Sequence, residues 1–218
     1  MGDKAKSPAV RGILKAARDG GELSKAGVLG RLGDLCTVSA KYDVAVSTAV
    51  GYLDHIVVQT TAGAQRCLEF LRKHKLGRAN FIPLDKMKKG AHDRQVETPE
   101  NAPRLFDVIT PCNYAVVPAL FLAVQNTLVA PDLETGSRWA FEFGARWRVV
   151  TEDGQVIDTA GTMSGGGKQV TRGRMRVAVR IYFRHRLVVV DPVIHVCKGS
   201  KKLVSNVGWW KTSPYHPC

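Results

Sequence analysis

Short apolar runs rich in β-branched residues alternate with amphipathic stretches along this chain, and this alternation is the strongest limit on its fold. HIVVQT (55–60) and ANFIPL (79–84) indicate short strands. Between them, four apolar residues have the i, i+3, i+4 and i+7 spacing of a helix that ends near Gly77: Ala64, Cys67, Leu68 and Leu71. Such strand–helix–strand units predict a mixed α/β or α+β fold with small sheets and helices.

The second half repeats the pattern after a polar connector. Residues 85–104 contain two prolines and no hydrophobic period, so we expect an exposed link there. The elements expected beyond the link are strands at 105–109 and 127–130, a helix at 117–125, a helix from Asp132 to about Phe143, and strands at 146–151 and 155–163. Asp153-Gly154, between the last two strands, is a strong hairpin signal.

The two ends of the chain differ from its body. Val10–Arg18 predicts a short helix that stops at Gly20-Gly21. Residues 177–218 contain one acidic residue and apolar runs without a long helical period, although Leu187–Val190 is a run of strand type. We therefore expect a helical stub at the N-terminal end and an irregular, poorly ordered basic tail at the C-terminal end.

The positive charge is concentrated at the same two ends. Of the formal net charge of +13, residues 1–26 contribute +3, residues 27–167 contribute 0 and residues 168–218 contribute +10. A neutral body with basic ends predicts an anion-facing surface where the ends emerge, and nucleic acid is the commonest such partner. A solvated tail that binds nothing is the alternative interpretation.

Motifs for catalysis and cofactor binding are incomplete. SGGGK (164–168) resembles a phosphate-binding loop, but a P-loop ending at Lys168 needs glycine at 162 and Ser or Thr at 169, where the chain has Thr162 and Gln169. The chain has no C-x-x-C, H-E-x-x-H or G-x-S-x-G motif. We expect no cofactor, no metal and no catalysis, and a nucleotide-using enzyme is a disfavoured alternative.

Other features bear on the compartment. No apolar run approaches the ~18 residues of a membrane span, so we expect no membrane partner. The first ten residues lack the apolar core of a signal peptide. The five cysteines are widely spaced and odd in number, which suits a reducing interior.

A cluster of glycines carries no chemistry of its own but requires an explanation. Gly161 and the run Gly165, Gly166 and Gly167 lie at the end of a predicted strand. Glycine weakens a strand, and one compensating benefit is close approach of another chain to the backbone. The alternative is a flexible turn before the basic segment.

Several segments together resemble the hinge domain of the structural maintenance of chromosomes (SMC) proteins, and most closely that of condensin subunits. They are GVLGRLGDL (27–35), KYDVAVSTAVGYLDHIVVQT (41–60), NFIPLDKM (80–87), TPENAPRLFDVI (98–109), NTLVAPDLETGSRWA (126–140), RWRVVTEDGQVIDTAGTMSGGG (146–167) and GRM (173–175). The match covers roughly residues 8–176. Its most specific part is RWRVVT followed by a hairpin and GTMSGGG.

The resemblance implies a domain organisation. Residues 27–176 form an SMC hinge with two small sheet-and-helix subdomains, at about 27–90 and 104–176. Residues 1–26 are then the end of a coiled-coil arm or a linker, and residues 177–218 are a divergent basic tail, because no heptads follow the hinge.

The resemblance also implies a function. Family hinges pair with the hinge of a second SMC subunit, so the expected dimer-interface residues are Gly161, Gly165, Gly166 and Gly167. Weak DNA contact near the coiled-coil exit is expected from Lys168, Arg172, Arg174 and Arg176. The family's ATPase motifs are absent from this chain, so ATP is implied only for the full-length protein.

The expected role is chromosome condensation and segregation, in the nucleus on chromosomes, with the cytoplasm as the alternative location. A free-standing basic nucleic-acid-binding protein is the competing function. Loss of all association at moderate salt would favour that competitor over a packed interface.

Overall fold

The computed structural model describes residues 7–18, 20–87, 90, 96–166, 171–183 and 186–190, with side chains as far as residue 178. The α-helices are α1 (Pro8–Ala16), α2 (Asp43–Ala49), α3 (Thr61–Lys73), α4 (Leu105–Val108), α5 (Val117–Val124) and α6 (Leu133–Phe141). The strands are β1 (Val28–Arg31), β2 (Cys36–Val38), β3 (Ile56–Val58), β4 (Phe81–Pro83), β5 (Ile109–Pro111), β6 (Leu128–Ala130), β7 (Val149–Thr151), β8 (Val156–Ile157), β9 (Met163–Ser164), β10 (Arg176–Val177), β11 (Val179–Phe183) and β12 (Arg186–Val190). Short 3-10 turns are η1 (Leu32–Asp34), η2 (Ala40–Tyr42), η3 (Gly51–Asp54), η4 (Leu84–Lys86), η5 (Pro99–Asn101) and η6 (Tyr114–Val116).

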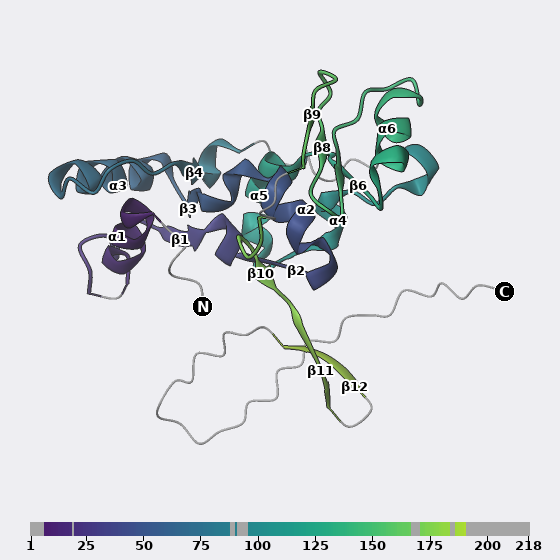
Figure 1. Ribbon diagram of the computed structural model, residues 1–218. Helices are drawn as coiled ribbons and strands as arrows, with labels where there is room; N and C mark the ends of the chain where they lie inside the picture. The colour runs from purple at the N-terminus through teal and green to yellow at the C-terminus, as the bar shows by residue number, and fades with distance from the viewer. Residues whose placement is uncertain are drawn as a thin grey trace.

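The N-terminal lobe consists of α1, β1, β3, α3 and β4 and lies at the left of Figure 1. Its sheet has the order β1-β3-β4, with β3 antiparallel to β1 and parallel to β4 across the α3 crossover. Thr60 begins α3 by accepting a hydrogen bond from the Gly63 N–H at 3.1 Å. Ile13, Ile56 and Cys67 are buried between helices and sheet. The strand–helix–strand prediction for residues 55–84 is confirmed.

A central apolar core joins segments from distant parts of the chain. The sheet beside it has the order β10-β2-β5, so the late strand β10 lies parallel to the early strand β2. Val38, Leu120, Val150 and Met175 all belong to this one buried cluster. The fold therefore depends on contacts between residues more than a hundred positions apart.

The strand predicted at 105–109 is wrong for most of its length. Residues 105–108 form the single-turn helix α4, and β5 begins only at Ile109. The Arg104 guanidinium donates two hydrogen bonds of 2.8 Å to Asp107, a pairing that suits helical i, i+3 spacing. The connector predicted just before it is not uniformly exposed, because Pro99 and Ala102 are buried.

The C-terminal lobe packs α6 on a sheet of order β6-β7-β8-β9 (Figure 1). Asp132 caps α6 as predicted, accepting from the Thr135 N–H at 2.8 Å. The Asp-Gly hairpin is also confirmed, since the Gly154 N–H donates to the Thr151 carbonyl in the turn joining β7 to β8. The strand predicted at 155–163 is two short strands instead, because the chain turns at 158–162 between β8 and β9.

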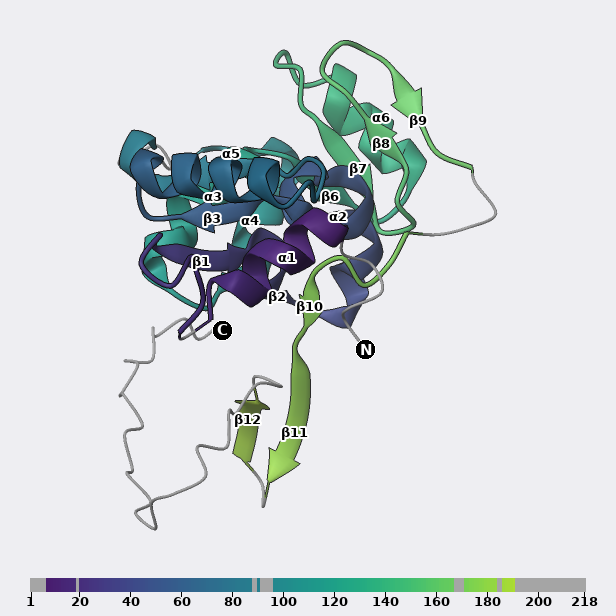
Figure 2. The ribbon, with the colours of Figure 1, turned by 90° about the vertical axis from the view of Figure 1, so that its left-hand side faces the viewer.

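Beyond β10 the chain forms an antiparallel pair, β11 with β12. Both views show the pair leaving the body in line with β10 (Figure 2). The expectation of an irregular tail is wrong for residues 179–183 and 186–190, whereas the strand-type run Leu187–Val190 lies in β12 as its composition indicates. Residues 191–218 lie outside the described residues.

Candidate partner-binding edge and basic segment

Strand β9 is the last strand of the C-terminal sheet. Within the described residues it pairs only with β8, with Met163 opposite Ile157 and Ser164 opposite Val156. Residues 161–166 are exposed, and the Met163 side chain is 54% exposed. In Figure 1 the β8–β9 ribbon projects from the top of the lobe. An edge strand with outward N–H and C=O groups can accept a strand from another chain.

The predicted interface glycines flank this strand. Gly161 and Gly166 have φ of +89° and +88°, and a Cβ built on either would meet no atom of the described residues within 4 Å. Backbone conformation therefore favours glycine at both positions, and the space before each is open to a partner. A Cβ on Gly165 would lie 2.8 Å from Cγ of Gln155, the residue just before β8. Gly167 lies outside the described residues.

The three predicted DNA-contacting cations that the structure describes differ in exposure. Arg172 is exposed, and Arg176 is half-buried at the start of β10. Lys168 lies outside the described residues. Arg174 points into the protein, unlike the exposed Arg172.

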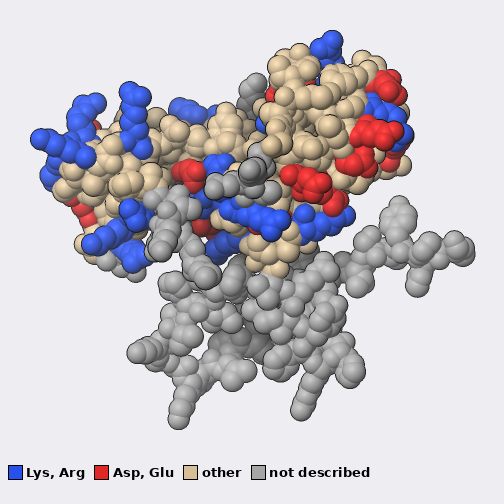
Figure 3. Space-filling view, viewed as in Figure 1, with Lys and Arg blue, Asp and Glu red and all other residues tan. Residues whose placement is uncertain are grey.

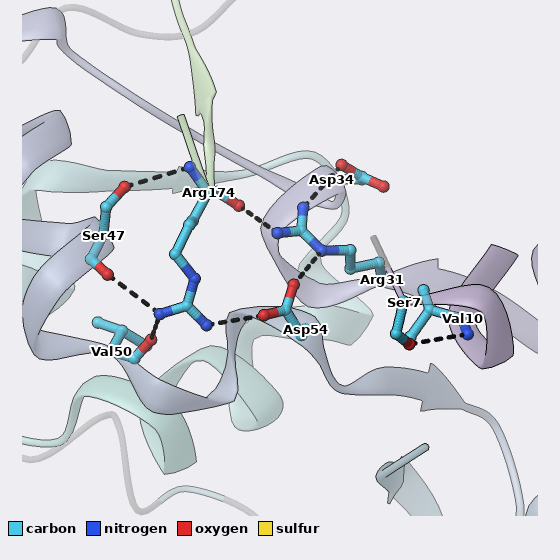
Figure 4. A network of polar contacts seen from close by, with 8 residues as sticks. All are labelled: Ser7, Val10, Arg31, Asp34, Ser47, Val50, Asp54 and Arg174. Carbon is cyan, nitrogen blue, oxygen red and sulfur yellow. Dashed lines mark hydrogen bonds and ion pairs between the residues drawn. The ribbon is translucent and has the colours of Figure 1, made fainter. Parts of the chain in front are cut away.

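The Arg174 side chain belongs to a partly buried polar network (Figure 4). Its Nη2 donates to Asp54 Oδ2 at 2.8 Å, and its Nη1 donates to the carbonyls of Ser47 and Val50 at 3.1 and 3.3 Å. These internal acceptors engage both terminal nitrogens of the guanidinium. In this conformation Arg174 is engaged within the protein, so the exposed Arg172 is the better placed of the two for DNA contact.

Charge separates between the two outer lobes, which the sequence analysis missed. In Figure 3 blue side chains gather on the left over α3, and red ones on the right over the C-terminal lobe. The cations of α3 and the turn after it are Arg66, Arg72, Lys73, Lys75 and Arg78, with Glu69 the acid among them. Asp132, Glu134 and Glu142 lie at α6. Counting residues 27–167 as one neutral block averaged these lobes, and charge counted per predicted helix would have separated them.

Two of the cysteines in the described part of the chain are buried. Burial raises the pKa of Cys36 to about 12 and that of Cys67 to about 11, so neither thiol is a nucleophile at neutral pH. Among the described residues no three His, Cys, Asp or Glu side chains gather as a metal site, and no helix is long and apolar enough to cross a bilayer.

The family is decided by comparison with known proteins. Residues 25–140, more than half of the chain, match the family described as SMC proteins Flexible Hinge Domain. This chain belongs to the SMC hinge family. What matches is the hinge alone, and no ATPase head domain is found in the chain.

Relatives with similar sequences include proteins called structural maintenance of chromosomes protein 4. This hinge is 49% identical over 158 residues to the Xenopus laevis protein of that name, covering 71% of this chain and 12% of the relative. It is 46% identical over 151 residues to the Saccharomyces cerevisiae protein, covering 69% of this chain and 10% of the relative. The hinge thus spans about a tenth of the relatives it matches.

Solved hinge structures confirm the mixed α/β fold. An asymmetric dimer of the Geobacillus stearothermophilus SMC hinge domain matches with a TM-score of 0.64 and 29% identity, covering 78% of this chain and 70% of that one. The Pyrococcus furiosus SMC hinge domain matches with a TM-score of 0.55 and 26% identity, covering 85% of this chain and 89% of that one.

Proposed function

We propose that this chain is the dimerisation module of a condensin-type SMC complex, pairing with the hinge of a second SMC subunit to organise chromosomes. The observation that carries the proposal is the exposed β9 edge with its flanking glycines, in a chain that belongs to the hinge family. A relative solved as a hinge dimer supports a partner of the same kind.

The edge supplies the physical means of association. A partner strand satisfies the outward backbone groups of β9, and Met163 becomes buried beside it. Gly161 and Gly166 let the partner backbone approach without a side chain intervening. The mechanism is binding and involves no cofactor in this chain; ATP belongs to the head of the full-length family protein.

We also propose weak, sequence-independent DNA contact at the basic end of the hinge, through Lys168, Arg172 and Arg176. Such contacts neutralise phosphates and release counterions. The corresponding location is the nucleus, on chromosomes. The basic α3 face favours one competitor, a basic nucleic-acid-binding protein that needs no partner hinge. A packed strand interface survives about 0.5 M salt, whereas purely electrostatic binding does not.

The test compares two glycines that both have a left-handed backbone conformation, one beside β9 and one far from it in the sequence. G166V at the β9 edge should weaken binding to the partner condensin hinge about tenfold or more, measured by sedimentation of the mixed chains. G144V is the matched control, because Gly144 has φ +69° and open space but lies in the loop after α6. Equal affinities for the two variants would refute the β9 interface.

A further inference from the structure

Residues 173–178, here called the strap, return from the C-terminal lobe and lie across the body beside β2. The Gly173 N–H donates to both carboxylate oxygens of Asp43 at 3.1 Å, and the Arg174 N–H donates to Ser47 Oγ at 3.2 Å. The Ala178 N–H donates to the Val38 carbonyl at 2.8 Å. Met175, 3% exposed, is the strap's buried apolar residue. The strap is therefore held mainly by polar contacts.

One carboxylate joins the strap to the start of the hinge (Figure 4). Asp54 Oδ1 accepts from Arg31 Nε at 2.8 Å, and Asp54 Oδ2 accepts from Arg174 Nη2 at 2.8 Å. Arg31 Nη2 also donates to the Arg174 carbonyl at 2.8 Å. Arg31 ends β1, and Arg174 precedes β10, so this cluster connects the places where the chain enters and leaves the body.

Where the strap passes Gly33, there is no room for a side chain on that residue. A Cβ on Gly33 would lie 2.3 Å from the Arg174 carbonyl oxygen and 2.9 Å from Arg31 Nη1. The nearest atom is backbone, so a methyl group there would have to displace the strap. Gly33 thus permits the seated position of the strap.

When the strap leaves, Arg31 still has carboxylate partners in the body. Arg31, only 3% exposed, retains Asp54 and also Asp34, whose Oδ1 lies 3.1 Å from its Nη1. The Asp54 side chain is 44% exposed, so water can solvate the oxygen that Arg174 would vacate. Departure of the strap therefore creates no isolated buried charge, which would otherwise be prohibitive.

We propose that residues 173–178 are a releasable strap, locked by Asp54, that sets where the chain beyond Ala178 leaves the hinge relative to where it enters. Seated, the strap extends the β2 sheet and holds that segment beside the end of β1. Released, it withdraws Met175 from the central core and frees the direction of the following chain, while the lobes and the rest of that core stay folded. The strap thereby couples a pull or a binding event beyond residue 178 to the start of the hinge.

Hydrogen exchange of the full chain, followed by mass spectrometry, tests this proposal. D54N should accelerate exchange in peptides covering 173–178 by about tenfold or more, since a charge-assisted bond is removed, while β3 and α3 are unchanged. D34N, which leaves the Asp54–Arg174 bond in place, should change strap exchange by less than about twofold. Uniform acceleration, or none, would overturn the proposal.

Two further pairs of variants test the strap even if D54N does not fold. R174Q should release the strap from its own side, and R172Q, at the exposed position two residues earlier, should not. G33A should unseat the strap, and G51A should not, because a Cβ on Gly51 meets nothing within 4 Å. If each control behaved like its partner variant, the strap would not be a separate unit.

Discussion

At the scale of single residues, Asp54 is the carboxylate that joins the two ends of the polar network. It accepts from two arginines that are 143 positions apart in the chain. Burial raises the pKa of Asp54, but hydrogen bonds from Arg174 and Arg31 more than offset this and leave the pKa below its ordinary value. The charged form is therefore favoured by folding.

This shift predicts a particular acid sensitivity. A depressed folded-state pKa contributes stability above the ordinary Asp pKa of about 4, and the contribution is lost as the pH falls through the folded value. Urea unfolding at a series of pH values from neutral to about 3 should show a smaller loss of unfolding free energy in D54N than in the wild type below about pH 4. D34N, with Asp54, Arg31, Arg174 and the neighbouring His55 in place, should keep most of the wild-type slope. Parallel curves for wild type and D54N would contradict the assignment.

At the scale of elements, the sequence predicted those features that depend on residues close together in the chain. The α3 helix, the Asp132 cap and the Asp-Gly turn depend on neighbours within a few residues, and all three are found in the structure. Of the four apolar residues predicted for the buried face of α3, Ala64, Cys67 and Leu71 are buried, but Leu68 is exposed. The α4 turn was missed because its apolar segment is too short for the spacing of its residues to distinguish a helix from a strand. The inward direction of Arg174 was missed because its acceptors come from α2, Val50 and η3, far away in sequence.

The cap of α3 gives a prediction at this scale. T60A removes the side-chain acceptor for the Gly63 N–H and should lower the unfolding free energy by about 1 kcal/mol. T60S keeps a hydroxyl in the same place and should lose only a small fraction of that amount. Chemical denaturation monitored by circular dichroism measures both. An equal loss in the two variants would mean that the methyl group, rather than the cap, matters.

At the scale of the whole molecule, the two outer lobes differ in charge. The α3 face is basic, and α6 carries acids, so a polyanion approaching the molecule is steered away from the C-terminal lobe that bears the β9 edge. The α3 face is thus the alternative to the proposed Lys168, Arg172 and Arg176 segment as the surface that contacts DNA. The family and the opposite charges of the two helices could be recognised from sequence, but the faces on which those charges lie depend on how the helices are placed in space.

The final prediction distinguishes which basic face contacts DNA. Replacing Lys168, Arg172 and Arg176 together with glutamine should weaken duplex binding equally for unrelated sequences and reduce the salt slope by roughly 2 to 3, because each phosphate that is no longer neutralised removes about one unit. The same number of charges removed from the α3 face, by R72Q, K75Q and R78Q, should leave most of the slope intact. Fluorescence anisotropy between about 50 and 200 mM salt measures both. A larger change from the α3 triple would move the DNA surface to the N-terminal lobe, and equal changes would indicate that net charge alone governs binding.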